Sequence, residues 1–176
     1  MKHHQRRLFH VSEEPGISAF VPRSPARADM NSEIGLVWAL CERTLPNYLT
    51  PRDCPRVTYH ARAETREEDI AAYMPKGYRH VVIIETGWLK RLEETTLYVY
   101  EFEPGGFYLQ DEAAGYYVSE STQAPIKITV VSDLKAELAR RNTALQTRDS
   151  LWGISEEIKK TSFYWSICRM GNAKGA

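Results

Sequence analysis

The chain has 176 residues, which suits one domain of ordinary size; 43% of them are hydrophobic and 26% are charged. Lysine and arginine together number 23, and so do aspartate and glutamate, so the formal net charge is zero. This balance argues against nucleic-acid binding through bulk charge and against an anionic membrane surface as partner. No apolar run approaches the roughly 20 residues that span a bilayer, and none follows the charged residues 1–7, so we expect neither a transmembrane helix nor a signal peptide.

Cysteine and histidine usage indicates a reducing compartment and no metal centre. Cys41, Cys54 and Cys168 are odd in number and widely spaced, which fits neither a disulfide framework nor a C-x-x-C zinc pattern. The five histidines lack the helical i, i+4 spacing that a His/Cys metal site uses. We therefore expect free thiols, a cytoplasmic location and no bound metal.

The first third of the chain is predicted to form short strands separated by loops. Runs rich in β-branched and aromatic side chains indicate strands at residues 8–11, 36–40 and 57–60. Alternation in the third run places Thr58 and His60 on one face and Val57 and Tyr59 on the other. A loop rich in proline and arginine follows the first strand, and a short helix or turn is expected between residues 41 and 49.

Two later segments favour helices. Thr65 can cap a helix in which Glu68 reaches back, and Pro75 and Gly77 end it. A second helix is expected over residues 133–146, with Ser132 as its cap and leucines along one stripe. Strands are expected at residues 80–84, 97–102, 116–118, 126–131 and, in the aromatic tail, 162–167.

About seven strands, two or three helices and no alternating β-α rhythm predict an α+β fold with a mostly antiparallel sheet. We expect a flexible segment at residues 1–7, a single globular domain over 8–170 and a flexible tail at 171–176. Neither a G-x-G-x-x-G motif nor a Walker loop is present, which excludes nucleotide binding by a Rossmann or a P-loop site.

The segment Pro51–Arg56 combines two prolines, two arginines, an aspartate and a cysteine in six residues. One interpretation is a rigid structural loop in which Cys54 is buried and Asp53 pairs with Arg52 or Arg56. A second is an anion site whose arginine forks bind phosphate or carboxylate. A third is a nucleophilic Cys54 with a pKa lowered by the arginines, although no histidine is fixed nearby by the sequence.

His10 and Ser12 form a second candidate site. If residues 8–11 belong to a strand, both side chains point to the same face, where a ring nitrogen and a hydroxyl can converge on one ligand. The alternatives are a half-exposed polar face, or a core histidine that bonds to the backbone.

Aromatic and acidic side chains supply further candidates. Most of the 10 tyrosines and four tryptophans must form the core, but Trp38 and Tyr48 lie near the arginine-rich loop in sequence and offer stacking surfaces for a flat ring. Glu101, Glu112 and Glu120 flank or lie in late strands, where a carboxylate could orient a ribose hydroxyl or act as a general base. The alternative for Glu112 is a solvated turn residue.

Several segments together resemble an uncharacterised bacterial family of small, single-domain cytosolic proteins. The likeness covers roughly residues 8–140 and the region of Arg169 and Met170, and the Pro-Arg-Asp-Cys-Pro-Arg stretch is its most specific part. The segments that carry it are Leu8–Glu13, Leu36–Ala39, Pro46–Leu49, Pro51–Val57 and Ala114–Ser119.

A more distant resemblance is to ADP-ribosyltransferase-like folds. It rests on His10-x-Ser12 in the first strand, on a strand ending in Trp38-Ala39, and on Tyr48 in the short helix that follows. In that superfamily a split antiparallel sheet cradles NAD, a first-strand histidine contacts the ribose or nicotinamide, a tyrosine stacks on the nicotinamide, and a late-strand glutamate supports an oxocarbenium-like transition state. The family's Gln/Glu-x-Glu motif has no late-strand counterpart except Glu101-Phe102-Glu103, which departs from the expected position.

These observations lead to one main hypothesis and two others. The resemblance implies that NAD or another phosphorylated small-molecule nucleotide binds in a central cleft, with ADP-ribosyltransferase-like chemistry in which His10 and Glu112 are catalytic and Glu120 is the rival carboxylate. A second hypothesis is a non-catalytic ligand-binding or interaction module in which the Pro51–Arg56 loop is structural, and a third is a Cys54-dependent enzyme. The residues expected to bind the nucleotide are His10, Ser12, Arg23, Trp38, Tyr48, Arg52 and Arg56.

Overall fold

The computed structural model describes residues 6–25 and 31–175. The backbone divides into two compact units: unit 1 is formed by residues 1–45 and 98–130, and unit 2 by residues 46–97 and 131–176. Each unit is built on one sheet, and both sheets are mostly antiparallel, which confirms the predicted α+β class.

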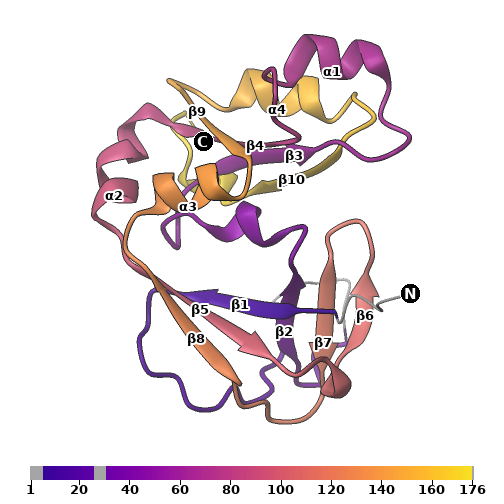
Figure 1. Cartoon of the computed structure of the whole chain (residues 1–176), viewed down its shortest axis with the longest axis vertical. Coiled ribbons are helices and arrows are strands. Elements are labelled where there is room, and N and C mark those ends of the chain that lie inside the picture. The colour runs from indigo at the N-terminus through magenta and orange to yellow at the C-terminus, as the bar shows by residue number, and fades with distance from the viewer. Residues whose placement is uncertain (1–5, 26–30, 176) are drawn as a thin grey trace. The chain divides into compact units, whose positions relative to one another are not determined.

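Unit 1 carries a six-stranded sheet in the order β6-β7-β2-β1-β5-β8 (Figure 1). Strand β1 lies inside this sheet and pairs antiparallel with β2 on one side and with β5 on the other. The strands are β1 (Leu8–Ser12), β2 (Val37–Cys41), β5 (Leu97–Phe102), β6 (Tyr108–Asp111), β7 (Tyr116–Ser119) and β8 (Lys127–Val131), and a 3-10 turn, η3, covers Pro104–Gly106.

One buried cluster of unit 1 lies on a single face of this sheet. Leu8 is opposite Phe102, and Ala39 is opposite Tyr117, so these side chains point the same way and exclude water together. The buried cluster comprises Leu8, Val37, Ala39, Phe102, Phe107 and Tyr117. The β-branched and aromatic residues that predict the strands therefore also build the core.

Unit 2 carries a four-stranded sheet in the order β10-β3-β4-β9, in which only the β4–β9 pair is parallel. The strands are β3 (Arg56–His60), β4 (His80–Glu85), β9 (Thr143–Arg148) and β10 (Tyr164–Cys168). The described chain has four α-helices, one more than the upper expectation: α1 (Glu67–Tyr73), α2 (Leu89–Glu94), α3 (Leu134–Arg140) and α4 (Trp152–Ile158). Short 3-10 helices are η1 (Leu45–Tyr48), η2 (Thr86–Trp88) and η4 (Met170–Asn172). Across the described residues, no helix has the length and apolar character needed to cross a membrane.

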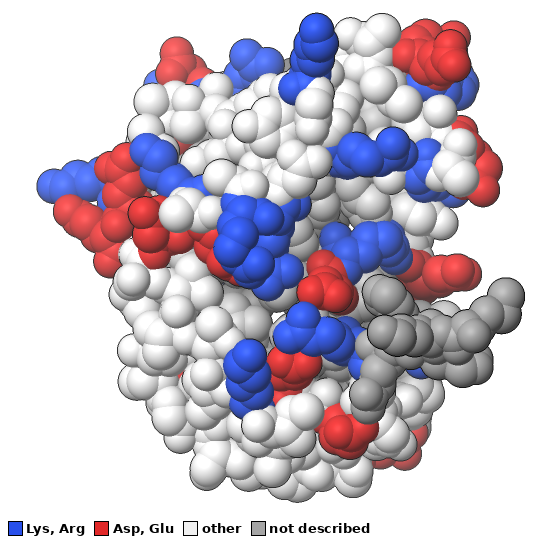
Figure 2. Space-filling view, in the orientation of Figure 1, with Lys and Arg blue, Asp and Glu red and all other residues white. Residues whose placement is uncertain are grey.

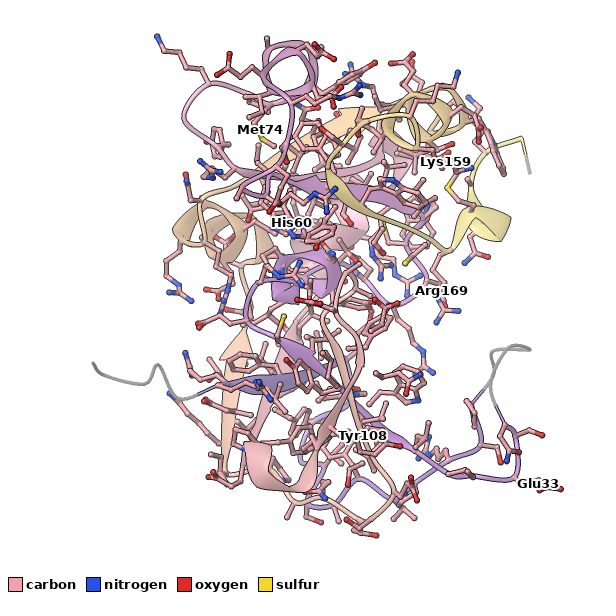
Figure 3. All side chains as sticks on the ribbon, turned by 90° about the vertical axis from the view of Figure 1, so that its right-hand side faces the viewer. Glu33, His60, Met74, Tyr108, Lys159 and Arg169 are labelled. Atoms are coloured by element: carbon pink, nitrogen blue, oxygen red, sulfur yellow. The ribbon has the colours of Figure 1, made fainter. Side chains whose placement is uncertain are left out.

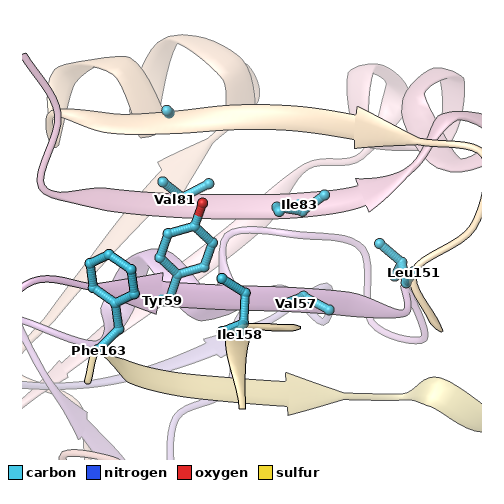
Figure 4. Close-up of a cluster of buried hydrophobic side chains, with 8 residues drawn as sticks. Val57, Tyr59, Val81, Ile83, Leu151, Ile158 and Phe163 are labelled. Carbon is cyan, nitrogen blue, oxygen red and sulfur yellow. The ribbon is translucent and has the colours of Figure 1, made fainter. Parts of the chain in front are cut away.

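Figure 4 shows one buried cluster of unit 2, against which Ile70 and Tyr73 of α1 and Ile154 of α4 also pack. Val57 and Tyr59 point into it from β3, as the alternation predicts, and Val81 and Ile83 join them from β4. The Tyr59 hydroxyl donates to the Tyr73 carbonyl oxygen at 2.6 Å, and burial raises the Tyr59 pKa to about 12. Because Val57 and Tyr59 face this core, Thr58 and His60 are directed to the opposite face of the sheet.

The prediction of a helix over residues 133–146 is wrong for the second half of that range. Helix α3 ends at Arg140, and Asn142 has a positive φ of 51°, a conformation that ends the helix. Leu145, expected on the helical stripe, instead lies in β9 opposite Val82. The cap is also displaced by one residue, because the Asp133 side chain, not that of Ser132, accepts the Ala136 N–H at 2.9 Å.

The capping box predicted at Thr65 is absent. The Thr65 hydroxyl accepts the Arg62 N–H at 2.8 Å and so closes the turn before α1. Arg66 occupies the N-cap position with no side-chain cap bond. Helix α1 instead has three acidic residues in its first turn, where the helix dipole favours them.

The two ends of the chain differ in what can be described. Residues 1–5 of the expected flexible segment lie outside the described residues, whereas Arg7 bonds to Glu101. At the other end, Ala173 is buried and the Lys174 N–H donates to the Glu85 carboxylate at 2.9 Å. The Trp152 indole N–H also donates to the Lys174 carbonyl oxygen, so this end is attached to unit 2 by specific bonds.

Candidate functional site

His10 and Ser12 lie on the same face of β1, which confirms the prediction from their spacing. His10 Nδ1 lies 3.1 Å from the Trp38 carbonyl oxygen. A carbonyl oxygen only accepts, so Nδ1 carries a proton and donates; Nε2 is the acceptor atom of this ring whenever the imidazole is neutral. Both side chains are half-buried, and the Ser12 hydroxyl accepts the Glu14 N–H at 3.0 Å.

Aromatic rings surround the His10 side of β1. The Phe20 ring centroid lies 4.8 Å from that of His10 and 5.2 Å from that of Tyr100. Tyr100 is directly opposite His10 on β5, and its hydroxyl donates to the Glu14 carbonyl oxygen at 2.6 Å. Tyr100 is fully buried, so the half-buried rings of His10 and Phe20 are the part of this group that a heterocyclic ligand could contact.

Trp38 belongs to the other face of the same sheet. Phe9 pairs with Leu40, so the register places the Trp38 side chain with those of Phe9 and Leu40 and away from that of His10. The Trp38 ring meets the Tyr116 ring edge-on at 5.5 Å. The structure therefore does not bring the Trp38 ring to the His10 side of the sheet.

The carboxylate candidates of unit 1 have different surroundings. Glu112 is exposed in the turn between β6 and β7, and its carbonyl oxygen accepts from the Arg43 guanidinium. Glu120 accepts from the Tyr108 hydroxyl at 3.0 Å, a bond that raises the Tyr108 pKa. Glu101 is opposite Phe9, on the face away from His10, and its hydrogen bonds to Arg7 lower its pKa.

Arg23, also in unit 1, pairs by its backbone with Leu36 just before β2. The Arg23 N–H donates to the Leu36 carbonyl oxygen at 3.1 Å, and the Leu36 N–H donates back at 2.8 Å. Its side chain is exposed, so the guanidinium can meet a ligand from solvent.

In unit 2, the Pro51–Arg56 segment is a turn that leads into β3. Cys54 is fully buried, and this burial raises its pKa to about 12 although Arg56 opposes the shift. A thiol with this pKa is protonated at neutral pH, and the thiolate is the nucleophile. The structure thus argues against the Cys54-dependent enzyme and agrees with the buried-cysteine interpretation.

Arg56 fixes this turn to the 3-10 helix η1. Its side chain is buried, its Nε donates to the Asn47 carbonyl oxygen at 2.6 Å, and its Nη1 donates to the Cys54 carbonyl oxygen at 3.1 Å. Its guanidinium carbon also lies 5.1 Å from the centre of the Tyr48 ring. The geometry gives Arg56 a structural role, while Arg52 is exposed on the same turn.

A second histidine group, His60 (labelled in Figure 3) and His80, was missed by the sequence reasoning. The two residues are directly opposite on β3 and β4, and their rings stack with centroids 5.0 Å apart and an interplanar angle of 23°. His80 Nε2 lies 2.6 Å from Asn47 Oδ1, and both imidazoles are buried. The alternation of Thr58 and His60 in the sequence indicated a polar face of the sheet. Only the register between β3 and β4 shows that His60 lies opposite His80.

Asn47 connects these groups into one cluster. Its carbonyl oxygen accepts from Arg56 and its side chain bonds to His80, so η1 joins the turn to the sheet. We call Asn47, Tyr48, Arg56, His60 and His80 the Asn47 cluster. Over residues 6–25 and 31–175, no three His, Cys, Asp or Glu side chains are grouped so that they could hold a metal ion.

A comparison with protein families identifies the chain at the level of its family. The family model of DUF6886, described as a family of unknown function, matches residues 9–173. The chain belongs to this family. The match spans both units and every candidate residue named above, and it confirms the expectation of an uncharacterised family. No curated protein and no solved structure matches this DUF6886 member significantly.

Proposed function

We propose that this DUF6886 protein binds NAD or a related phosphorylated nucleotide, with the nicotinamide-ribose end against the His10 face of β1. The observation that carries the proposal is the His10 ring, which the Trp38 carbonyl oxygen orients through Nδ1–H at 3.1 Å. A neutral imidazole held in this way accepts a hydrogen bond through Nε2, and ribose hydroxyls are donors of the required kind.

The neighbours of His10 support a nucleoside in preference to a simple anion. Residues two apart on a strand are about 7 Å apart, so His10 and Ser12 suit two separate groups on one ligand. Phe20, which is half-buried, supplies aromatic surface beside His10 that a heterocyclic ring can contact, whereas Tyr100 is fully buried behind it. Unit 1 therefore offers both polar and stacking groups within one short stretch of sheet.

Arg23 is the proposed phosphate ligand of unit 1, because its guanidinium is exposed and planar. Arg56 is not proposed as a phosphate ligand, because its side chain donates to the Asn47 and Cys54 carbonyl oxygens. Arg52 remains a candidate of unit 2, and the Arg52→Ala variant tests it separately. A loss of nucleotide affinity in Arg52→Ala at unchanged melting temperature assigns it to the ligand.

The reaction that the ADP-ribosyltransferase resemblance implies breaks the bond between nicotinamide and its ribose, and a nucleophile (water in the absence of an acceptor) forms the new bond to that ribose carbon. A carboxylate stabilises the positive charge that develops on the ribose, and Glu112 is the proposed residue. The readout is nicotinamide released from NAD. Glu112→Gln should abolish release and retain NAD binding, whereas Glu120→Gln, its matched control, should retain both; the reverse result transfers the role to Glu120.

Isothermal titration calorimetry with NAD tests the binding. The wild-type chain should give binding heat, and His10→Ala should lose most of it. His10→Asn is the sharper variant, because an asparagine amide can still donate to the Trp38 carbonyl oxygen but has no counterpart of Nε2. Loss of binding in His10→Asn at an unchanged melting temperature supports a direct ligand contact, and no heat from the wild type ends the proposal.

The second candidate function is a non-catalytic ligand-binding or interaction module in which the Pro51–Arg56 turn is structural. The specific observation that favours it is the pair of hydrogen bonds from buried Arg56 to backbone carbonyl oxygens. This function predicts a lower melting temperature for Arg56→Lys and no nicotinamide release by any variant. Sustained nicotinamide release by the wild-type chain contradicts it.

A further inference from the structure

Strand β8 is an unusual edge of the sheet of unit 1. It is the last strand in the order β6-β7-β2-β1-β5-β8, so one of its sides has no neighbouring strand in that sheet. All five residues from Ile126 to Val130 are exposed, and the apolar ones alternate: Ile126 is 61% exposed, Ile128 44% and Val130 60%. An apolar stripe on an edge strand is a template for pairing with another chain.

The other edge of this sheet, β6, also exposes two large side chains, Tyr108 at 48% and Leu109 at 47%, but its pairing is less regular than that of β8. The β6–β7 register shifts between Leu109 and Asp111, and such a bulge disrupts a regular edge. The Tyr108 hydroxyl on β6 is bonded to Glu120 (Figure 3 labels Tyr108). Strand β8 has one charged side chain, Lys127, and no proline in its interior. Native sheets usually blunt both edges, so the regular β8 edge is the one better suited to pair with another strand.

The backbone of β8 offers regularly spaced bonding groups on its open side. The Ile126 N–H donates to the Glu101 carbonyl oxygen of β5 at 2.8 Å, so it points into the sheet. Because successive residues of a strand direct their N–H and C=O groups to opposite sides, those of Lys127 and Thr129 point outward. These outward groups are what a further strand would bond.

We propose that β8 pairs antiparallel with β8 of a second copy of this chain, with the two-fold axis at Ile128. In this register Lys127 of each copy faces Thr129 of the partner subunit, and these pairs exchange about four backbone hydrogen bonds. Ile126 faces Val130 of the partner subunit, and the Ile128 side chains face each other, so apolar residues meet across the strands. A two-fold interface of this kind joins two copies and leaves no equivalent edge for a third.

Charge favours a second copy as the occupant. The formal net charge is zero, so two copies do not repel each other as wholes. Near β8, Lys127 and Arg7 both interact favourably with Glu101, and Arg7 also pairs with Glu42, which leaves this group of four charges balanced. The register at Ile128 avoids placing Lys127 opposite itself, and Figure 2 shows a mostly uncharged surface where Figure 1 places β8.

Engineered cysteines test the register. The proposed axis places Ile128 at a non-hydrogen-bonded pair with Cα atoms about 4.5 Å apart, within disulfide range. Ile128→Cys should therefore form a disulfide-linked dimer on mild oxidation. Ile126→Cys is the matched control and should not form one, because residue 126, though even more exposed, lies about 13 Å from residue 126 of the partner subunit. The wild-type chain, with its three native cysteines, sets the background.

Sedimentation velocity over a range of concentrations tests the dimer itself. The wild-type chain and Thr129→Ala should dimerise as concentration rises, because both keep the outward N–H of residue 129. Thr129→Pro removes that donor, should remain monomeric, and should keep its melting temperature because no bond to β5 is lost. A wild-type chain that is monomeric at every concentration, or Ile126→Cys cross-linking as well as Ile128→Cys, overturns the proposal. It is independent of nucleotide binding, since either experiment can fail without affecting the other.

Discussion

The two units each hold a histidine site, and the two sites differ in how their polar atoms are used. In unit 1, His10 is half-buried and bonds to one strand carbonyl. In unit 2, His60 and His80 are buried and stacked, and His80 bonds to Asn47, which also holds Arg56. The comparison teaches that residue type alone does not separate the two sites, whereas burial does: the His10 ring is reachable from solvent and the unit 2 pair is not.

The largest expected effect concerns Cys54. Burial raises its pKa to about 12 from an ordinary 9.0, so its thiolate fraction near neutral pH falls about a thousandfold. Iodoacetamide should therefore modify the half-buried Cys41 and Cys168 long before Cys54, as peptide mass mapping over time would show. Rapid labelling of Cys54 in the folded chain would restore the cysteine-nucleophile hypothesis.

Replacement of Arg56 by alanine tests the structural side of the comparison. The variant loses two charge-assisted hydrogen bonds to carbonyl oxygens and leaves a cavity, so the free energy of unfolding should fall by about 2 to 4 kcal/mol. Urea denaturation measures this change. The matched control is Arg52→Ala on the same turn, where the exposed side chain predicts a change within about 0.5 kcal/mol. Equal losses of unfolding free energy in Arg56→Ala and Arg52→Ala would contradict the structural role of Arg56.

Asp69 provides a pH-dependent test of unit 2. Hydrogen bonds from the Ser162 hydroxyl and N–H, at 2.6 and 2.8 Å, and from Arg66 lower the Asp69 pKa in the folded state. A depressed folded pKa contributes stability above the unfolded value near 3.9, and this contribution is lost as pH falls through the folded pKa. Asp69→Asn should cost about 1 to 2 kcal/mol at pH 7 and show a weaker acid dependence below pH 4. Parallel pH–stability curves for both proteins would refute this assignment.

The smallest expected effect is that of His10 on stability. His10→Asn keeps a donor for the Trp38 carbonyl oxygen, so the free energy of unfolding should change by less than about 1 kcal/mol. His80→Asn removes half of a buried stacked pair and should cost more, which urea denaturation of the two variants would measure. A larger loss in His10→Asn than in His80→Asn would reverse the comparison between the two sites.

Local patterns predicted most of the strands, because alternation and β-branched runs act within a few residues. Strands β4, β5 and β7 lie within a residue of their expected bounds, and the faces of Val57 and Tyr59 are as predicted. The second half of the helix over 133–146 failed because Leu145 pairs with Val82, a contact distant in sequence that overrides helical periodicity. Helices α2 and α4 were not predicted, and their N-cap residues, Trp88 and Leu151, make no side-chain cap bond that a sequence motif could signal.

The candidate site was predictable only in part, for a related reason. The shared face of His10 and Ser12 follows from spacing alone. The separation of Trp38 from His10 depends on the β1–β2 register, and the meeting of His60 with His80 depends on that of β3 and β4. Register is set by long-range pairing, which one sequence does not display.

The central claim is that His10, and not the pair in unit 2, is the nucleotide-binding histidine. Long-range ¹⁵N–¹H spectra of the histidine rings, recorded during titration with NAD, test it most directly. The account predicts that the protonated nitrogen of free His10 is Nδ1, and that NAD shifts the His10 ring signals while those of His60 and His80 stay unchanged. Unchanged His10 signals at saturating NAD would contradict the account.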